Sequence, residues 1–438
     1  MTRTRKWKWV GTLAAIGLCL LVVLGWSYYT TRPNYRLELG QESLRRGDSG
    51  WQLASLANWF AFAGRPPRQG HDRAQRLVWV LEAGDHPLHA HLLRGQLLFE
   101  QEKYELALEE LNAIPEVFWD RREPLRLQTA SMVGQCLLKM NLPRQAERPF
   151  RYTVEKWPED LDPHRGLIDA HRGLFVIYYD QGALTPGLYH LRELARLEPT
   201  DGRPWRTMGY IAKDILEQNP TAVEYYQEAL RRDLGPRAVE ETHMEFGEVL
   251  VKQCKYQEAL THLEQVRAIP KVLALRAECL WSLGKSSEAK ELVSQALESV
   301  NGEPEALDAL RLKARIYLDE SHDEPAPGGA SRYVQEAEGL LKRALLIDSH
   351  DHVSRHLLSQ AYDKMGRSAD AAEQRRLLAQ THSYLQELAE LNKIAMEHPW
   401  DAEVRQRLEQ VCLKLNLKEL AEMWRRAAQT SAGAGNAR

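Results

Sequence analysis

Two short histidine clusters are the segments of this chain best suited to bind a metal. They are HPLHAH, residues 86–91, and HDHVSRH, residues 350–356. In the second cluster His352 and His356 stand four residues apart, so on a helix their imidazoles would share one face with a neighbouring aspartate or histidine as third donor. Neither cluster contains a matched acid or repeats the spacing of the other. We expect solvated histidines and no metal, and keep a metal-dependent enzyme as an alternative.

Other patterns that could support chemistry are absent or incomplete. Gly284-Lys285-Ser286 ends like a P-loop, but Cys279 stands where the first glycine must be. The signatures HExxH, GxSxG and GxGxxG do not occur. We therefore expect no enzyme and no cofactor. No CxxC spacing is present, and we expect buried, unpaired thiols at Cys136, Cys254, Cys279 and Cys412.

The overall composition is that of a globular protein. Of the 438 residues, 44% are hydrophobic and 27% are charged, which excludes a wholly disordered chain. Lysine and arginine number 58 against 61 acids, so the composition does not favour nucleic-acid binding.

The amino-terminal segment predicts a membrane anchor. A basic leader, residues 1–9, precedes an apolar run that, with its flanking aromatic residues, gives a transmembrane helix over 10–29. The charges of the leader place the amino terminus in the cytoplasm and the rest of the chain outside, in a bacterial periplasm, with the lipid bilayer as a partner of 10–29. The alternative is a secreted protein cleaved near Ser27. Residues 30–49 would form a stalk and a capping helix.

A pattern of about 34 residues recurs after this segment. Its clearest copy is Trp205-x2-Met208-Gly209, followed by Ala222, Tyr226 and Ala229. The pattern resembles the tetratricopeptide repeat (TPR), W-x2-L-G-x2-Y followed by A-x3-F-x2-A. Units begin near residues 50, 88, 127, 168, 202, 240, 270, 307, 352, 384 and 402, where the unit at 384 is weak enough to be a lone helix.

The resemblance implies an all-α fold, a right-handed α-solenoid of about ten helix-turn-helix repeats over residues 50–430, preceded by the transmembrane helix. Large residues at helical spacing make one stripe on each helix, and a glycine or alanine between them admits the partner helix. One pair alone cannot bury its stripe, so neighbouring pairs must stack. The longest inter-helix insertion is expected at 319–332, and a disordered tail at 431–438.

Members of the TPR family bind extended peptides or partner helices along their concave face. Carrying the groove positions of the family to this sequence gives a surface of alternating charge with two aromatic residues. The best-matched unit holds Arg206 and Tyr210 where the chaperone-tail binders carry a Lys/Asn clamp, so that peptide class is not supported. The expected partner-binding groove comprises Arg203, Arg206, Tyr210, Lys213, Glu248, Glu278, Trp281, Arg311, Arg315, His356 and Gln360.

Together these features predict a membrane-anchored TPR scaffold that binds a partner protein in its groove during assembly of a cell-envelope complex. The first alternative is a regulatory or substrate-presenting subunit of an envelope enzyme, of the cytochrome-maturation or polysaccharide-export type. The second is the metal-dependent enzyme built on the histidines.

Overall fold

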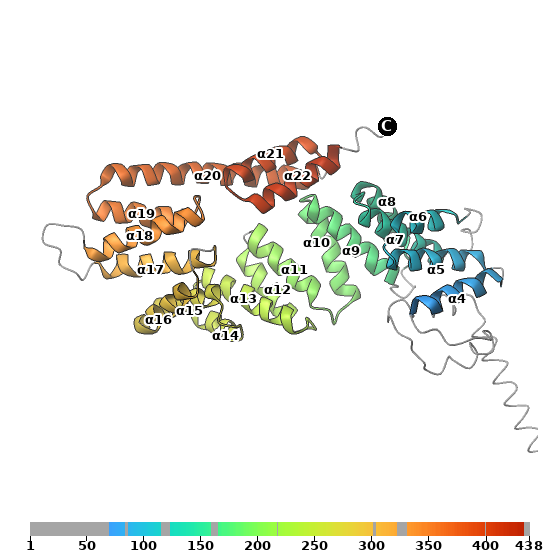
Figure 1. The fold of residues 1–438 in the computed structure, drawn as a ribbon, viewed down its shortest axis with the longest axis horizontal. Helices are drawn as coiled ribbons and strands as arrows, with labels where there is room; N and C mark the ends of the chain where they lie inside the picture. The colour runs from blue at the N-terminus through green and yellow to red at the C-terminus, as the bar shows by residue number, and fades with distance from the viewer. Residues whose placement is uncertain are drawn as a thin grey trace, which may run out of the picture. The chain divides into compact units, whose positions relative to one another are not determined.

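The fold is described from a computed structural model, which covers residues 70–83, 86–114, 123–158, 165–216, 218–300, 304–321, 331–398 and 400–432. The chain divides into two compact units, residues 1–173 and 174–438. In the described ranges all regular elements are helices, apart from one isolated bridge between Asp201 and Asp233 (Figure 1). The all-helical class predicted from the repeats is therefore confirmed.

In the described ranges the first unit contains five complete helices and the first part of a sixth. The short helix α6 packs on α5, and α8 packs on α7, so the helices form consecutive pairs. The bounds are α4 Gly70–Ala83, α5 Pro87–Glu100, α6 Tyr104–Asn112, α7 Glu123–Lys139, α8 Pro143–Lys156 and α9 Arg165–Asp180, which continues into the second unit.

The second unit also consists of consecutive helix pairs, and among the described residues it contains more of them than the first unit does. The bounds are α10 Leu184–Leu197, α11 Arg203–Tyr210, the π-helix η2 Ile211–Ile215, α12 Asn219–Leu230, α13 Pro236–Lys252, α14 Tyr256–Leu263, α15 Pro270–Ser282, α16 Ser286–Glu298, the 3-10 turn η3 Pro304–Ala306, α17 Leu307–Glu320, α18 Arg332–Ile347, α19 His352–Lys364, α20 Ser368–Glu397, α21 Ala402–Lys414 and α22 Lys418–Ala432.

Most of the described turns inside the pairs share one backbone geometry. The second residue after the first helix of a pair has positive φ, as at Gly284 (φ +79) and Gly366 (φ +71). This left-handed residue ends the helix. The backbone N–H of the next residue then donates a hydrogen bond to a carbonyl in the last turn of the helix, as Lys285 N does to Leu280 O at 2.9 Å. Gly284-Lys285-Ser286 is such a turn.

In four of the described pairs, α5–α6, α7–α8, α11–α12 and α13–α14, a glycine on the first helix faces a large side chain on the second. A Cβ on Gly209 would lie 2.7 Å from Tyr226, and one on Gly247 would lie 2.6 Å from Leu263. Both of these large side chains are fully buried. The two helix backbones therefore approach to a distance that only glycine permits.

Several sequence expectations need correction or lie outside the described residues. No described helix is long and apolar enough to cross a membrane, so the single-pass location is not supported, and its basis, residues 10–29, lies outside the description. Four other expected segments also lie outside the described residues: the leader 1–9, the stalk and capping helix 30–49, residues 322–330 of the insertion and residues 433–438 of the tail. The weak unit near 384 falls within the single helix α20. Cys254 is exposed, whereas the other three described cysteines are buried, and all four are free.

Replacing Gly209 with alanine tests the close approach. Because Tyr226 is fully buried and cannot move aside, we expect Gly209→Ala to lower stability by about 1–3 kcal/mol. The measurement is the urea midpoint of helix loss by circular dichroism. Gly339→Ala is the control, since a Cβ on Gly339, inside α18, meets nothing within 4 Å and should stabilise the helix by up to about 1 kcal/mol. Equal effects of the two substitutions would contradict the constraint.

Candidate partner-binding face of the second unit

The structure places the predicted groove residues on the first helices of five successive pairs, all in the second unit. We call this set the first-helix face. It is made of Arg203, Arg206 and Tyr210 on α11, Lys213 on η2, Glu248 on α13, Glu278 and Trp281 on α15, Arg311 and Arg315 on α17, and His356 and Gln360 on α19.

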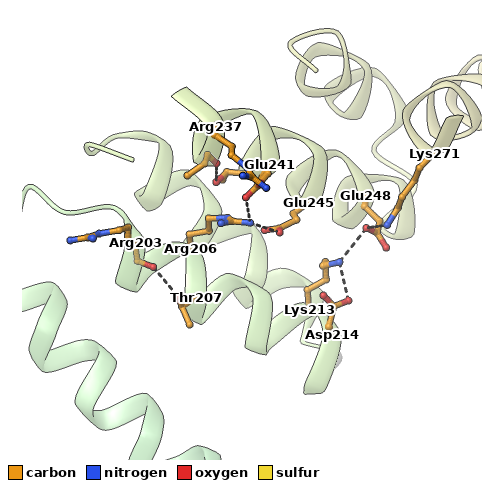
Figure 2. A network of polar contacts seen from close by, with 12 residues as sticks. Arg203, Arg206, Thr207, Lys213, Asp214, Arg237, Glu241, Glu245, Glu248 and Lys271 are labelled. Atoms are coloured by element: carbon orange, nitrogen blue, oxygen red, sulfur yellow. Dashed lines mark hydrogen bonds and ion pairs between the residues drawn. The ribbon is translucent and has the colours of Figure 1, made fainter. Parts of the chain in front are cut away.

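The cations of α11 are paired with acids rather than free. Figure 2 shows Arg206 reaching from α11 to two glutamates of α13, with its Nη2 at 2.8 Å from Glu245 Oε1 and 3.1 Å from Glu241 Oε2. Arg203 is exposed and pairs with Asp201, with 2.7 Å between Nη2 and Oδ2. The pKa of Arg203 is raised by that carboxylate.

Lys213 is the most buried cation of the face, at 5% exposure. The π-helical segment η2 carries it, and this rare geometry shifts the residue relative to an ordinary α-helical register. Its Nζ lies 2.9 Å from Asp214 Oδ1 and 3.2 Å from Glu248 Oε2. Burial by itself would lower the pKa of Lys213, but Glu248 and Asp214 outweigh it and the pKa is raised. The lysine therefore stays charged in a nearly water-free position.

Glu248 connects three successive repeats. Its Oε2 accepts from Lys213 of η2 and also from Lys271 of α15, whose Nζ lies at 3.0 Å (Figure 2). Burial alone would raise the pKa of Glu248, but Lys271 and Lys213 hold it below its usual value. The carboxylate is therefore the centre of an ion-pair cluster that joins η2, α13 and α15.

The pairing continues along the next first helices. Arg315 Nη1 lies 3.3 Å from Glu278 Oε1, which joins α17 to α15. Arg311 pairs with Asp308 and donates to Asp351 Oδ1 at 2.8 Å, which joins α17 to the start of α19. Burial would lower the pKa of Arg311, but the two aspartates raise it. We call this series of ion pairs between successive first helices the charge ladder.

The remaining predicted residues flank the ladder. Tyr210 is 40% exposed, whereas Trp281 is half-buried and packs against the core. His356 and Gln360 are exposed and contact each other at 3.0 Å between their side-chain nitrogens. Tyr210 is thus the aromatic side chain of the predicted set that is most open to a partner.

Sequence reasoning missed the partners of the cations. The acids Glu241, Glu245 and Asp351 and the base Lys271 were not among the expected site residues. The members of the cross-repeat pairs stand 23 to 40 residues apart, near one repeat length, but this separation alone does not single out which side chains meet. Of the expected groove cations on α11, Arg206 is therefore compensated by α13 and Arg203 by Asp201.

The histidine clusters do not converge. His91 pairs with Glu110 at 2.8 Å, and His350 contacts Thr381 Oγ1 at 3.2 Å. Asp351 caps α19 by accepting from Ser354 N at 2.8 Å. Among the described residues no three histidines, cysteines or acids are arranged to hold a metal ion. The metal-dependent alternative thus has no ligand set in the described ranges.

Comparisons with known proteins give only distant similarity. No protein-family model matches the sequence, and no curated protein matches it. The C-terminal part of a TPR repeat-containing protein from Cytophaga hutchinsonii is 14% identical, covers 62% of this chain and 98% of its own, and superposes with a TM-score of 0.41. PilF from Pseudomonas aeruginosa is 18% identical, with coverages of 51% and 92% and a TM-score of 0.34. Yeast Tom70 is 16% identical, with coverages of 80% and 68% and a TM-score of 0.34. Similarity at this level indicates neither a partner nor an activity.

Removing the central carboxylate of the ladder should destabilise the second unit. Glu248→Gln keeps the shape but leaves Lys213 nearly buried with Asp214 alone, so we expect a loss of roughly 1–3 kcal/mol in a urea titration. Glu288→Gln is the matched control. Glu288 lies in the first turn of α16 and forms only an exposed ion pair, with the N-cap residue Lys285. A Glu248→Gln effect no larger than that of the control would show that the ladder contributes no stability.

A histidine pair in the same repeat gives a pH dependence. His243 Nδ1 and His262 Nδ1 lie 2.9 Å apart, so one must accept a hydrogen bond in its neutral form. Burial lowers the pKa of both, and His243 lowers that of His262 further. A base whose folded pKa is depressed binds fewer protons than in the unfolded chain, so its contribution is present above the ordinary value of about 6.5 and is lost as the pH falls below it.

We therefore expect the unfolding temperature to fall as the pH is lowered from about 7.5 to about 5.5, and to fall less in His262→Gln. His356→Gln, on an exposed histidine, should keep the native slope. The measurement is a series of thermal melts across this range. Parallel slopes in the native chain and in His262→Gln would disprove the assignment.

Proposed function

We propose that this chain is a non-enzymatic scaffold that binds a partner protein on the first-helix face of the second unit. The observation that carries the proposal is the exposed Tyr210 beside a continuous series of paired charges that spans five repeats. Exposed aromatic side chains within a polar rim are typical of the residues that dominate protein interfaces.

The charge ladder supports the proposal in a second way. Side chains that are already held by ion pairs lose little conformational entropy when a partner binds, so the face is preorganised. Because each cation is compensated by an acid, we infer that the partner does not need a strong net charge. Binding should then depend only weakly on salt, in contrast to recognition of an acidic tail by free lysines.

The proposal is limited to protein binding. The envelope-assembly role and the envelope-enzyme alternative both depended on the expected membrane segment, and no described residue supports either one. The metal-dependent enzyme is not proposed, since the histidines do not converge in the described ranges.

Photo-crosslinking from Tyr210 tests this function. A benzophenone amino acid at Tyr210 should capture a discrete partner in cells, and the same probe at Leu346, which is 86% exposed on the second helix α18, should not. With the captured protein purified, Tyr210→Ala should weaken binding by about tenfold, since a central aromatic contributes about 1–2 kcal/mol.

Two outcomes would contradict the proposal. The first is the same set of adducts from Tyr210 and from Leu346, which would show that the first-helix face has no preferred partner. The second is unchanged affinity in Tyr210→Ala, which would place the partner elsewhere on the chain.

A further inference from the structure

The last helix pair of the second unit contacts the turn between α9 and α10, more than 200 residues earlier in the chain. Arg405 on α21 is fully buried and bonds to Gln181, 224 residues away. Gln181 and Trp424 of α22 are also buried. Both sides of this contact lie within the compact unit 174–438.

Every N–H donor of the Arg405 guanidinium has an acceptor in this contact. Its Nε donates to Gln181 Oε1 at 3.2 Å, and Nη2 donates to Gln181 O at 2.6 Å and to Ala395 O at 3.4 Å. Its Nη1 donates to His398 O and to Asp401 O, both at 2.9 Å. The five donors of an arginine are thus satisfied, but only when Gln181 supplies two of the acceptors.

Three of the five acceptors are backbone carbonyls at the carboxyl ends of helices. Ala395 and His398 lie at the carboxyl end of α20, and Gln181 directly follows α9. The carbonyls at the end of a helix lack partners within the helix and carry its negative partial charge, so a cation between two such ends is favoured. Arg405 therefore holds together the carboxyl ends of α9 and α20.

Neighbouring side chains fit the same contact. Ser431 Oγ donates to Gln181 Oε1 at 3.2 Å. Gly182 has φ +68, and a Cβ there would lie 2.1 Å from the ring of Trp424. Burial raises the pKa of Asp180, against a smaller opposite effect of Arg426 on α22. The turn thus meets α22 so closely that no side chain other than hydrogen is accommodated at position 182.

Among the described residues, no carboxylate lies within ion-pair distance of Arg405. Burial lowers its pKa to about 10, against a smaller opposite effect of Asp401. Lys213 and Arg311, by contrast, gain carboxylates. The cation of Arg405 has therefore lost water without gaining an anion, which makes this contact less favourable than a buried ion pair of similar geometry.

We propose that the α9–α10 turn and the α21–α22 pair form an intramolecular closure that opens as a unit and, when formed, limits the movement of the repeats between them. The first-helix face lies in this interval of the chain, so opening would release the constraint on α11 to α19. The inference does not rest on the proposed function, because the closure is a property of the free protein.

Gly182→Ala tests the closure from the side opposite Arg405. The added methyl group should displace the ring of Trp424, while every residue of the last helix pair stays unchanged in sequence. Gly366→Ala is the matched control. Gly366 also stands two residues past a first helix and has φ +71, but a Cβ there meets nothing within 4 Å. Both substitutions thus strain the turn, and only the first interferes with the closure.

The measurement is the distance between spin labels on the full chain, attached through non-canonical amino acids at the exposed positions Arg192 and Gln429. We expect one narrow distance distribution in the native chain and in Gly366→Ala. In Gly182→Ala we expect a broad distribution shifted to longer distances. Arg405→Met should give the same broadening. Since Arg405 also caps α20, circular dichroism must first show that this variant keeps its helices.

Three results would overturn the proposal. One is a Gly182→Ala distribution indistinguishable from that of Gly366→Ala. Another is a broad distribution already in the native chain. The last is a distance signal in a mixture of chains labelled singly at Arg192 or at Gln429, because it would show that the contact forms between two copies of the protein.

Discussion

The close approach of two helix backbones within a repeat is the constraint on which the rest of the structure depends. At Gly209 and Gly247 the opposing side chain occupies the space that a Cβ would take, so the helices pack closely along this line. Each pair then has an apolar stripe that it cannot bury by itself, and the next pair must cover it. The shared core that joins α12 to α16 follows from this requirement.

The same constraint determines where polar side chains can lie. With the apolar stripes facing neighbouring pairs, the first helices of successive repeats stand near enough for long side chains to meet. Arg206 reaches Glu245, and Glu248 reaches Lys271, each across a repeat boundary. The charge ladder is therefore a consequence of stacking, and it adds electrostatic attraction to an interface already fixed by apolar packing.

The helix pairs were predictable because their signals are local. Apolar spacing, a small residue on the first helix and an alanine-aromatic stripe on the second occur within one repeat length of sequence, and α11 and α12 form where Trp205 and Tyr226 predict them. The ion-pair partners were not, since they depend on the angle between repeats. Arg405 had no distinguishing signal at all, because in the sequence it reads as one more polar residue of an amphipathic helix.

Buried cations in this protein differ in what replaces their water. Lys213 and Arg311 gain carboxylates and have raised pKa values, whereas Arg405 gains only neutral oxygens and its pKa falls to about 10. Because an uncompensated charge gives back part of the free energy gained by packing, the contact of Arg405 should open more readily than the ladder does. An inner series of repeats joined by ion pairs and a less stable closure can therefore coexist in one compact unit, with the closure as the element that conditions or ligands would bias first.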